Sequence, residues 1–112
     1  ITIVAKLKQE QKRIEEMISE LEKQKKEIDK KYSSIMDEEN KIYDEMRRCR
    51  DMYQYSKLQM RLNVLSNQRR SIEQKKQEIE MKIRGYGEEL EKVKRRIEYL
   101  TPRGRLVSEG GR

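Results

Sequence analysis

Few residues of this chain carry the side chains that enzymes most often use for acid–base or metal chemistry. The 112-residue sequence contains no His and a single Cys. His is the commonest general base and metal ligand, and one Cys forms neither an internal disulfide nor a Cys-rich metal site. Adjacent carboxylates such as Glu15 and Glu16 do occur, but neighbouring residues on a helix do not face each other. We therefore expect no enzymatic activity, no cofactor and no metal.

Basic side chains offer another kind of chemistry, the binding of acidic partners. The net charge is +7, and residues 57–101 alone carry 12 basic and 7 acidic side chains. Such an excess favours nucleic acid, an acidic protein surface or a tubulin-like lattice. The candidates for contacts of this kind are Arg95, Arg96, Arg103 and Arg105. The alternative is that Arg95 and Arg96 belong to a solvated coiled-coil surface and that the tail with Arg103 and Arg105 is a linker. No DNA- or RNA-reading motif accompanies them, so the sequence favours a protein partner over nucleic acid.

The composition restricts the elements that can position these side chains. Charged residues make up 44% of the chain and hydrophobic residues 33%, with no Trp and no Phe. This composition cannot fill a sizeable globular core, but it is sufficient for a narrow seam between helices.

Two rows of apolar residues with a seven-residue spacing predict such a seam. One row runs from Leu7 to Cys49 and the other from Leu58 to Leu100. A strict heptad repeat keeps an apolar stripe facing a partner helix in a coiled coil, so we expect an all-α coiled coil of two heptad segments. The expected seam residues are Leu7, Ile14, Ile18, Leu21, Ile28, Ile35, Ile42, Met46, Leu58, Leu62, Leu65, Ile72, Ile79, Ile83, Leu90, Val93, Ile97 and Leu100.

Polar residues interrupt the companion row of seam positions at Gln11, Lys25, Glu39, Arg69 and Lys76. Polar residues at such positions weaken a coiled coil and help to fix its register and its partner. We expect these five residues to determine register and partner.

The two rows are out of phase by two residues, which turns the apolar stripe by roughly 200° around a helix. The chain therefore breaks or the seam is re-routed near residues 50–57. We expect a first helix over 1–50, a turn or phase slip over 51–57, a second helix over 58–101 and a flexible, basic, Gly-rich tail over 102–112.

Two arrangements of these helices remain open. In an antiparallel hairpin, residues whose numbers total about 104 face each other, which sets Lys25 against Ile79 and Glu39 against Leu65. In a parallel homodimer Lys25 and Glu39 would face their own copies, at an electrostatic cost. However, residues 50–57 contain no Gly, Pro or Asn to make a turn, which keeps open one continuous long helix in a parallel or antiparallel dimer. Of these arrangements the sequence slightly favours the antiparallel hairpin.

Two short segments have two interpretations each. If the chain turns, Met52, Tyr53 and Tyr55 form an exposed docking tip; otherwise they fill the phase slip. Gly85 and Gly87 either lie in a weakened but continuous helix or form a hinge.

The sequence thus predicts a non-enzymatic coiled-coil module, a scaffold or oligomerisation element of a larger intracellular assembly in the cytoplasm or nucleus. Its expected partners are proteins that pack helix against helix, either further copies or another coiled-coil chain. One alternative is an antiparallel arm or stalk of a motor or ATPase machine. Another is a basic scaffold that contacts nucleic acid through the second half and tail. The longest apolar run is Ile3-Val4-Ala5, so we expect no membrane span. The chain opens on Ile1 rather than Met, which suggests a piece of a longer protein.

Overall fold

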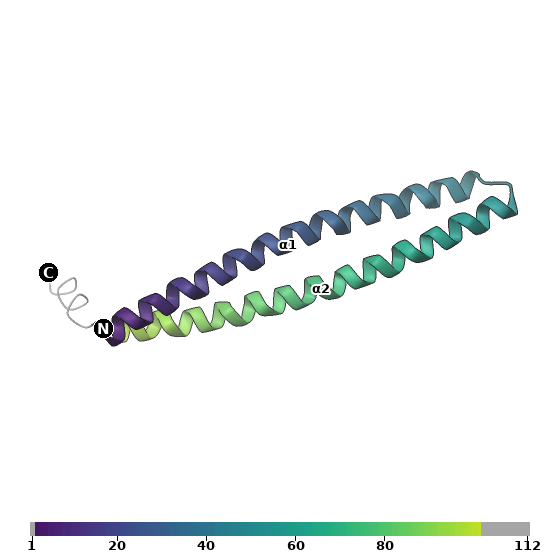
Figure 1. Ribbon diagram of the computed structural model, residues 1–112. Helices are drawn as coiled ribbons and strands as arrows, with labels where there is room; N and C mark the ends of the chain where they lie inside the picture. Colours follow the sequence, from purple (N-terminus) through teal and green to yellow (C-terminus); the bar gives the residue numbers. More distant parts are fainter. Residues whose placement is uncertain (1, 102–112) are drawn as a thin grey trace. The chain divides into compact units, whose positions relative to one another are not determined.

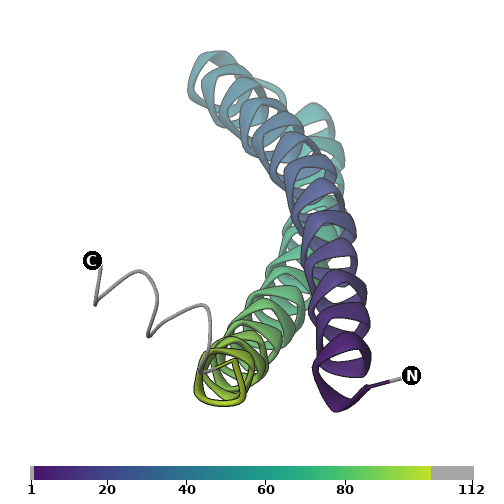
Figure 2. The same cartoon turned by 90° about the vertical axis from the view of Figure 1, so that its left-hand side faces the viewer.

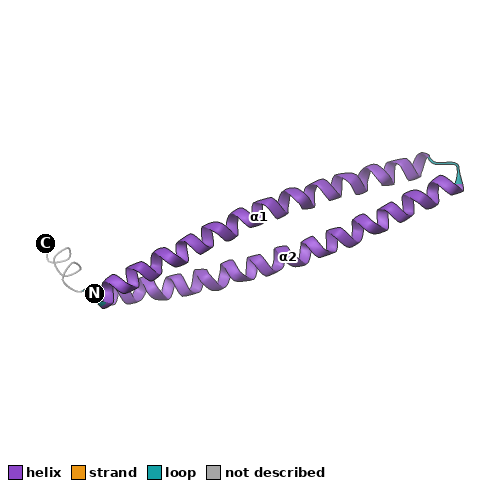
Figure 3. Ribbon diagram, in the orientation of Figure 1, coloured by secondary structure: helices purple, strands orange, loops and turns teal. Residues whose placement is uncertain are grey.

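The chain forms two long α-helices in a computed structural model that describes residues 2–101. Helix α1 spans Ile3–Arg48 and helix α2 spans Met52–Tyr99. The described residues contain no strand (Figure 3). The expectation of an all-α fold is confirmed.

Local signals account for the helix ends. Thr2 caps α1, because its Oγ1 accepts a hydrogen bond of 3.0 Å from the backbone N–H of Ala5. Arg47 and Arg48 lie in the last turn of α1, where positive charge complements the helix dipole. Helix α2 ends at Tyr99, and Pro102 follows within a few residues.

The connection between the helices is much shorter than the segment 51–57 expected from the sequence. Only residues 49–51 separate α1 from α2 (Figure 1). Asp51 makes this possible by capping α2: its Oδ1 accepts a 3.1 Å hydrogen bond from the backbone N–H of Tyr53. Its carbonyl accepts another of 2.9 Å from the N–H of Tyr55. The alternative of one continuous helix is therefore wrong, because a capping Asp replaces the missing Gly or Pro.

The helices contribute to two compact units, which we name by their position in the chain. The turn unit is Gln24–Glu80, and the terminal unit combines Ile1–Lys23 with Met81–Arg112. In each unit a segment of α1 lies beside a segment of α2 that runs in the opposite direction (Figures 1 and 2).

The turn unit has an apolar core close to the connection. Ile42, Leu62 and Leu65 are buried there, and Leu65 is only 1% exposed. Partly buried apolar residues packed against them are Ile35, Met46 and Leu58. Ile42 and Leu62 have numbers that total 104, so the hairpin register predicted from the heptads holds at this layer.

The terminal unit buries Ile14, which has no exposed surface, and Val93, which is 9% exposed. Around them the other seam residues of this unit are half-buried: Leu7, Ile18, Leu21, Ile83, Leu90, Ile97 and Leu100. Across both units all eighteen expected seam residues are buried or half-buried, and they include every buried apolar residue of the described chain.

Helix α2 runs without a break through Gly85 and Gly87. A Cβ atom added at either glycine would meet no atom within 4 Å. No other described part of the chain comes close enough to require a glycine at these positions. The two glycines therefore lie in a continuous helix, as the first of the two interpretations expected.

Replacing Leu65 by Ala tests the apolar core. We expect Leu65→Ala to lower the free energy of unfolding by about 2–5 kcal/mol, because it leaves a cavity in the buried cluster. The neighbouring Val64→Ala serves as the control, since Val64 is 47% exposed and its loss should change stability by less than about 0.5 kcal/mol. Urea unfolding followed by far-UV circular dichroism measures both, and equal effects would contradict the assigned seam.

Replacing Gly85 by Ala tests the interpretation of the glycines. We expect Gly85→Ala to raise the free energy of unfolding by about 0.5–1 kcal/mol, because Ala has the higher helix propensity and its methyl group meets no neighbour. Arg84→Ala, at the adjacent exposed position, is the control and should be close to neutral. A loss of thermal stability in Gly85→Ala would show that the backbone at residue 85 is not an ordinary helical turn.

Candidate functional site

Polar side chains from both helices meet along the edge of the seam in the turn unit. Tyr32 Oη donates a hydrogen bond of 3.1 Å to Glu73 Oε2. Lys25 Nζ lies 3.2 Å from Glu80 Oε2, and Lys76 Nζ lies 2.8 Å from Asp29 Oδ1. These contacts join α1 to α2 at successive turns of the helices.

The contacts follow one rule of register. Lys25 was expected to face Ile79, and its ammonium instead reaches the residue directly after it, Glu80. Glu39 was expected to face Leu65, and its carboxylate likewise accepts a hydrogen bond from Ser66. Tyr32 with Glu73 and Lys76 with Asp29 share the same offset, so that each pair of residue numbers totals 105. A long polar side chain keeps its stem against the apolar seam and turns its polar end towards the neighbouring residue.

Glu39 and Arg69 form the most buried of these contacts. Glu39 is only 3% exposed, although it is charged. Its Oε1 accepts a 2.7 Å hydrogen bond from Arg69 Nε, and its Oε2 accepts a 2.9 Å bond from the hydroxyl of Ser66. Arg69 also lies 3.6 Å from Glu73 through its Nη1 atom. Two residues that were expected to fix register independently therefore bind each other.

The charges in these contacts stabilise the ionised state of their partners. The hydrogen bond to Glu39 raises the pKa of Arg69, and the hydrogen bond to Asp29 raises the pKa of Lys76. A raised lysine pKa means that the Lys76–Asp29 contact stabilises the fold below the ordinary lysine pKa. That contribution is lost as the pH rises through the folded-state value.

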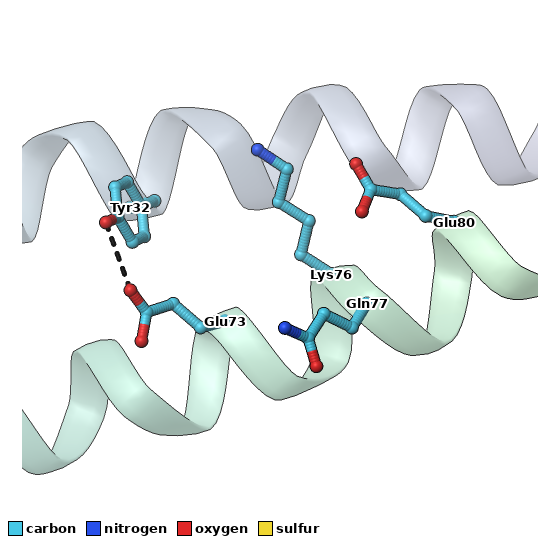
Figure 4. A pocket seen from close by; sticks show the side chains of 5 residues that line it. All are labelled: Tyr32, Glu73, Lys76, Gln77 and Glu80. Carbon is cyan, nitrogen blue, oxygen red and sulfur yellow. Dashed lines mark hydrogen bonds between the residues drawn. The ribbon is translucent and has the colours of Figure 1, made fainter.

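A shallow hollow of about 470 Å³ lies beside these contacts. It is lined by Tyr32, Glu73, Lys76, Gln77 and Glu80. Figure 4 shows Lys76 and Glu80 reaching from α2 towards α1, with Tyr32 bound to Glu73. All four ionisable residues of the lining already bind groups of this chain, so the hollow is built from structural contacts.

The remaining residue expected to fix register, Gln11, lies in the terminal unit and is half-buried. Its Nε2 donates a long hydrogen bond of 3.4 Å to Glu15 Oε2 on the same helix. This contact does not reach the other helix, unlike those of Lys25, Glu39, Arg69 and Lys76.

The three residues of the expected docking tip are exposed beside the connection. Met52 is 76% exposed, Tyr53 66% and Tyr55 41%, and we call these three the turn-end patch. A groove of about 430 Å³ adjoins it. Its lining is Tyr43, Met46, Arg47, Tyr55, Gln59 and Leu62. Tyr55 therefore belongs to both the patch and the groove. In the groove it lies with the seam residues Met46 and Leu62.

The expected contacts to acidic partners are only partly described. Arg95 and Arg96 are exposed on α2. Arg103 and Arg105 lie outside the described residues. Within residues 2–101 no group of three or more potential metal ligands occurs. Neither described helix is long and apolar enough to span a membrane.

Sequence reasoning missed the partners of the polar seam residues, namely Asp29, Ser66, Glu73 and Glu80. Each was visible in the sequence as a polar residue directly after a seam residue. Once an antiparallel register is fixed, that position is the nearest polar neighbour of the facing side chain. The register matched each polar side chain to the apolar residue directly opposite, whereas the polar end reaches the residue one position further along.

Replacing Glu39 by Ala tests the buried polar contact. We expect Glu39→Ala to lower the free energy of unfolding by about 1–3 kcal/mol, because the Ser66 hydroxyl and the Arg69 guanidinium lose their acceptor. Glu38→Ala is the matched control, since Glu38 pairs with Arg61 at the surface and should contribute less than about 0.5 kcal/mol. Chemical unfolding of both variants in parallel measures the difference, and a neutral Glu39→Ala would refute the importance of the contact.

Comparison with known proteins found no matching family, no matching curated protein and no matching solved structure.

Proposed function

We propose that the chain is a non-enzymatic coiled-coil interaction module, which holds together a larger assembly by docking other proteins on its outer surface. One observation carries this proposal: the seam residues pack within the chain, while large apolar residues stay exposed beside the connection. The apolar stripe that drives helix association is therefore already occupied. Contacts with other proteins must use different residues, and the turn-end patch supplies them.

The polar contacts in the seam support a module of defined register. Glu39 and Arg69 satisfy each other only when α1 and α2 are aligned as observed, because a shift by one residue moves the carboxylate away from its donors. A fixed register in turn fixes which residues stand at the connection. The proposed mechanism is thus the presentation of a defined surface, without chemical turnover.

An arm or stalk of a larger machine is the second candidate, and the connection favours it. The chain reverses over residues 49–51, and exposed aromatic residues follow directly at Tyr53 and Tyr55. In an arm of this kind the two helices resist bending and the reversal contacts a distant partner. The intracellular location expected from the sequence stays a prediction for both candidates.

Removing the turn-end patch tests the proposed function. We expect the triple variant Met52→Ser, Tyr53→Ser, Tyr55→Ser to leave its native assembly in extracts of the source organism, as measured by size-exclusion chromatography and immunodetection. Its helix content and thermal midpoint should stay close to those of the wild type, because these side chains are exposed.

The matched control replaces three exposed residues of α2 that lie away from the connection, Gln74, Lys75 and Glu78, by Ser. This control should remain in the assembly. The proposal fails if the turn-end variant and the seam-breaking Leu65→Asp variant both elute with the wild-type assembly.

A further inference from the structure

Helix α2 exposes a second apolar line on the side opposite its seam. Tyr53, Met60 and Val64 are 66%, 67% and 47% exposed. Together with Lys57 they follow the spacing of one helix face, and we call these four residues the outer stripe. At about 100° per residue, Met60 points roughly 200° away from both Leu58 and Leu62, which belong to the seam. The first turns of α2 are therefore apolar on two opposite sides.

An apolar second side is typical of a helix that is packed between two neighbours. Here the contiguous apolar line is confined to residues 53–64, because the same side of α2 continues with the polar residues Asn67, Ser71 and Gln74. Further along this side Met81 is exposed, but it follows polar residues and stands alone. Apolar residues tolerated at random on an exposed surface would be scattered along the helix, so chance does not explain this short line well. Residues 53–64 span roughly 16 Å at 1.5 Å per residue, the length of about three helical turns.

The charges that this part of α2 itself contributes are all positive, although Arg61 and Arg69 already pair with Glu38 and Glu39 of α1. Residues 52–72 contain Lys57, Arg61, Arg69 and Arg70 but no acidic residue, in a chain of which 44% is charged. Lys57 lies in the stripe itself, where its Nζ sits 4.6 Å from the centre of the Tyr53 ring. Negative charge on a partner would therefore complement Lys57 within the stripe.

A second copy of the chain does not fit this requirement. Two outer stripes packed face to face would place Lys57 of both copies in one interface with no acidic residue in either stripe, which is electrostatically unfavourable. The outward side of α1 does carry acidic residues, such as Asp37 and Asp44. However, it offers charged neighbours like Lys41 in place of apolar side chains.

We propose that the outer stripe binds an acidic amphipathic helix of another protein. Apolar residues of that helix pack on Tyr53, Met60 and Val64, and its flanking carboxylates approach Lys57. The result is a third helix against the outside of α2 near the connection. The inference deepens the proposed function and rests on it, because it names the partner class of an interaction module.

A designed peptide tests the proposal without knowledge of the natural partner. The probe is a stapled helical peptide of about 18 residues, roughly five turns, with Leu at helical spacing along one side and Glu at the remaining positions. A second peptide carries Lys in place of every Glu. Fluorescence anisotropy of the labelled peptides measures affinity for the full chain, and ¹H–¹⁵N NMR locates the binding site.

We expect the Glu peptide to bind and to shift the amide signals around Tyr53, Met60 and Val64, with little binding of the Lys peptide. Met60→Glu should weaken binding by at least about tenfold, because it removes an apolar contact and adds a like charge. Gln74→Glu is the matched control: it makes the same charge change at an exposed position two heptads further along α2, and should leave the affinity nearly unchanged.

Other occupants of the stripe give different results, and each would overturn the proposal. A dimer in light scattering that Met60→Glu abolishes would identify a second copy of the chain. Shifts at the stripe with oligo-dT or with anionic phosphatidylserine vesicles, but not with the Glu peptide, would identify nucleic acid or lipid. If the Glu peptide fails to bind while the turn-end variant still leaves its native assembly, the inference falls and the proposed function stands.

Discussion

The antiparallel contact between segments of α1 and α2 is the interaction on which the order of this chain depends. With 33% hydrophobic residues and no Trp or Phe, the sequence can supply one narrow apolar surface per helix. Each helix would have little stability alone in water, because most helical stability in proteins comes from packing of an apolar face. In the turn unit this packing centres on Ile42, Leu62 and Leu65, and in the terminal unit it includes Ile14 and Val93.

The polar residues within the seam add little stability but restrict the register in which the two helices can pair. Replacement of a buried ion pair by apolar residues is often neutral or stabilising, so the Glu39–Arg69 contact is weak evidence for stability as such. It does discriminate between registers, because apolar layers tolerate a shift by a heptad whereas a carboxylate without its donors does not. Lys25 and Lys76 add the same discrimination with carboxylates at the surface of the seam. The apolar residues of the seam thus hold the helices together, and its polar residues determine their register.

Sequence periodicity was sufficient to predict the helices and the side of each helix that is buried, because the heptad spacing of residues such as Leu65 and Ile42 reports directly on burial. It placed a break near residues 50–57 but did not predict a connection as short as residues 49–51. Asp51 was counted as one charge among many, although a capping residue acts through its position relative to the next helix. The outer stripe was missed for a related reason. A heptad frame assigns Met60 and Val64 to surface positions, and the structure shows that both apolar side chains are exposed there.

The three-residue connection also bears on the order in which the chain folds. Loop closure becomes more costly as the closed loop lengthens, although only logarithmically. Ile42 and Leu62 are separated by 20 positions along the chain, whereas Ile14 and Val93 are separated by 79. We therefore expect native contacts to form first beside Asp51, between residues close in sequence, and later between residues that are further apart along the chain. The segment that presents Tyr53 and Tyr55 would then be among the earliest parts of the nascent structure to acquire its final shape.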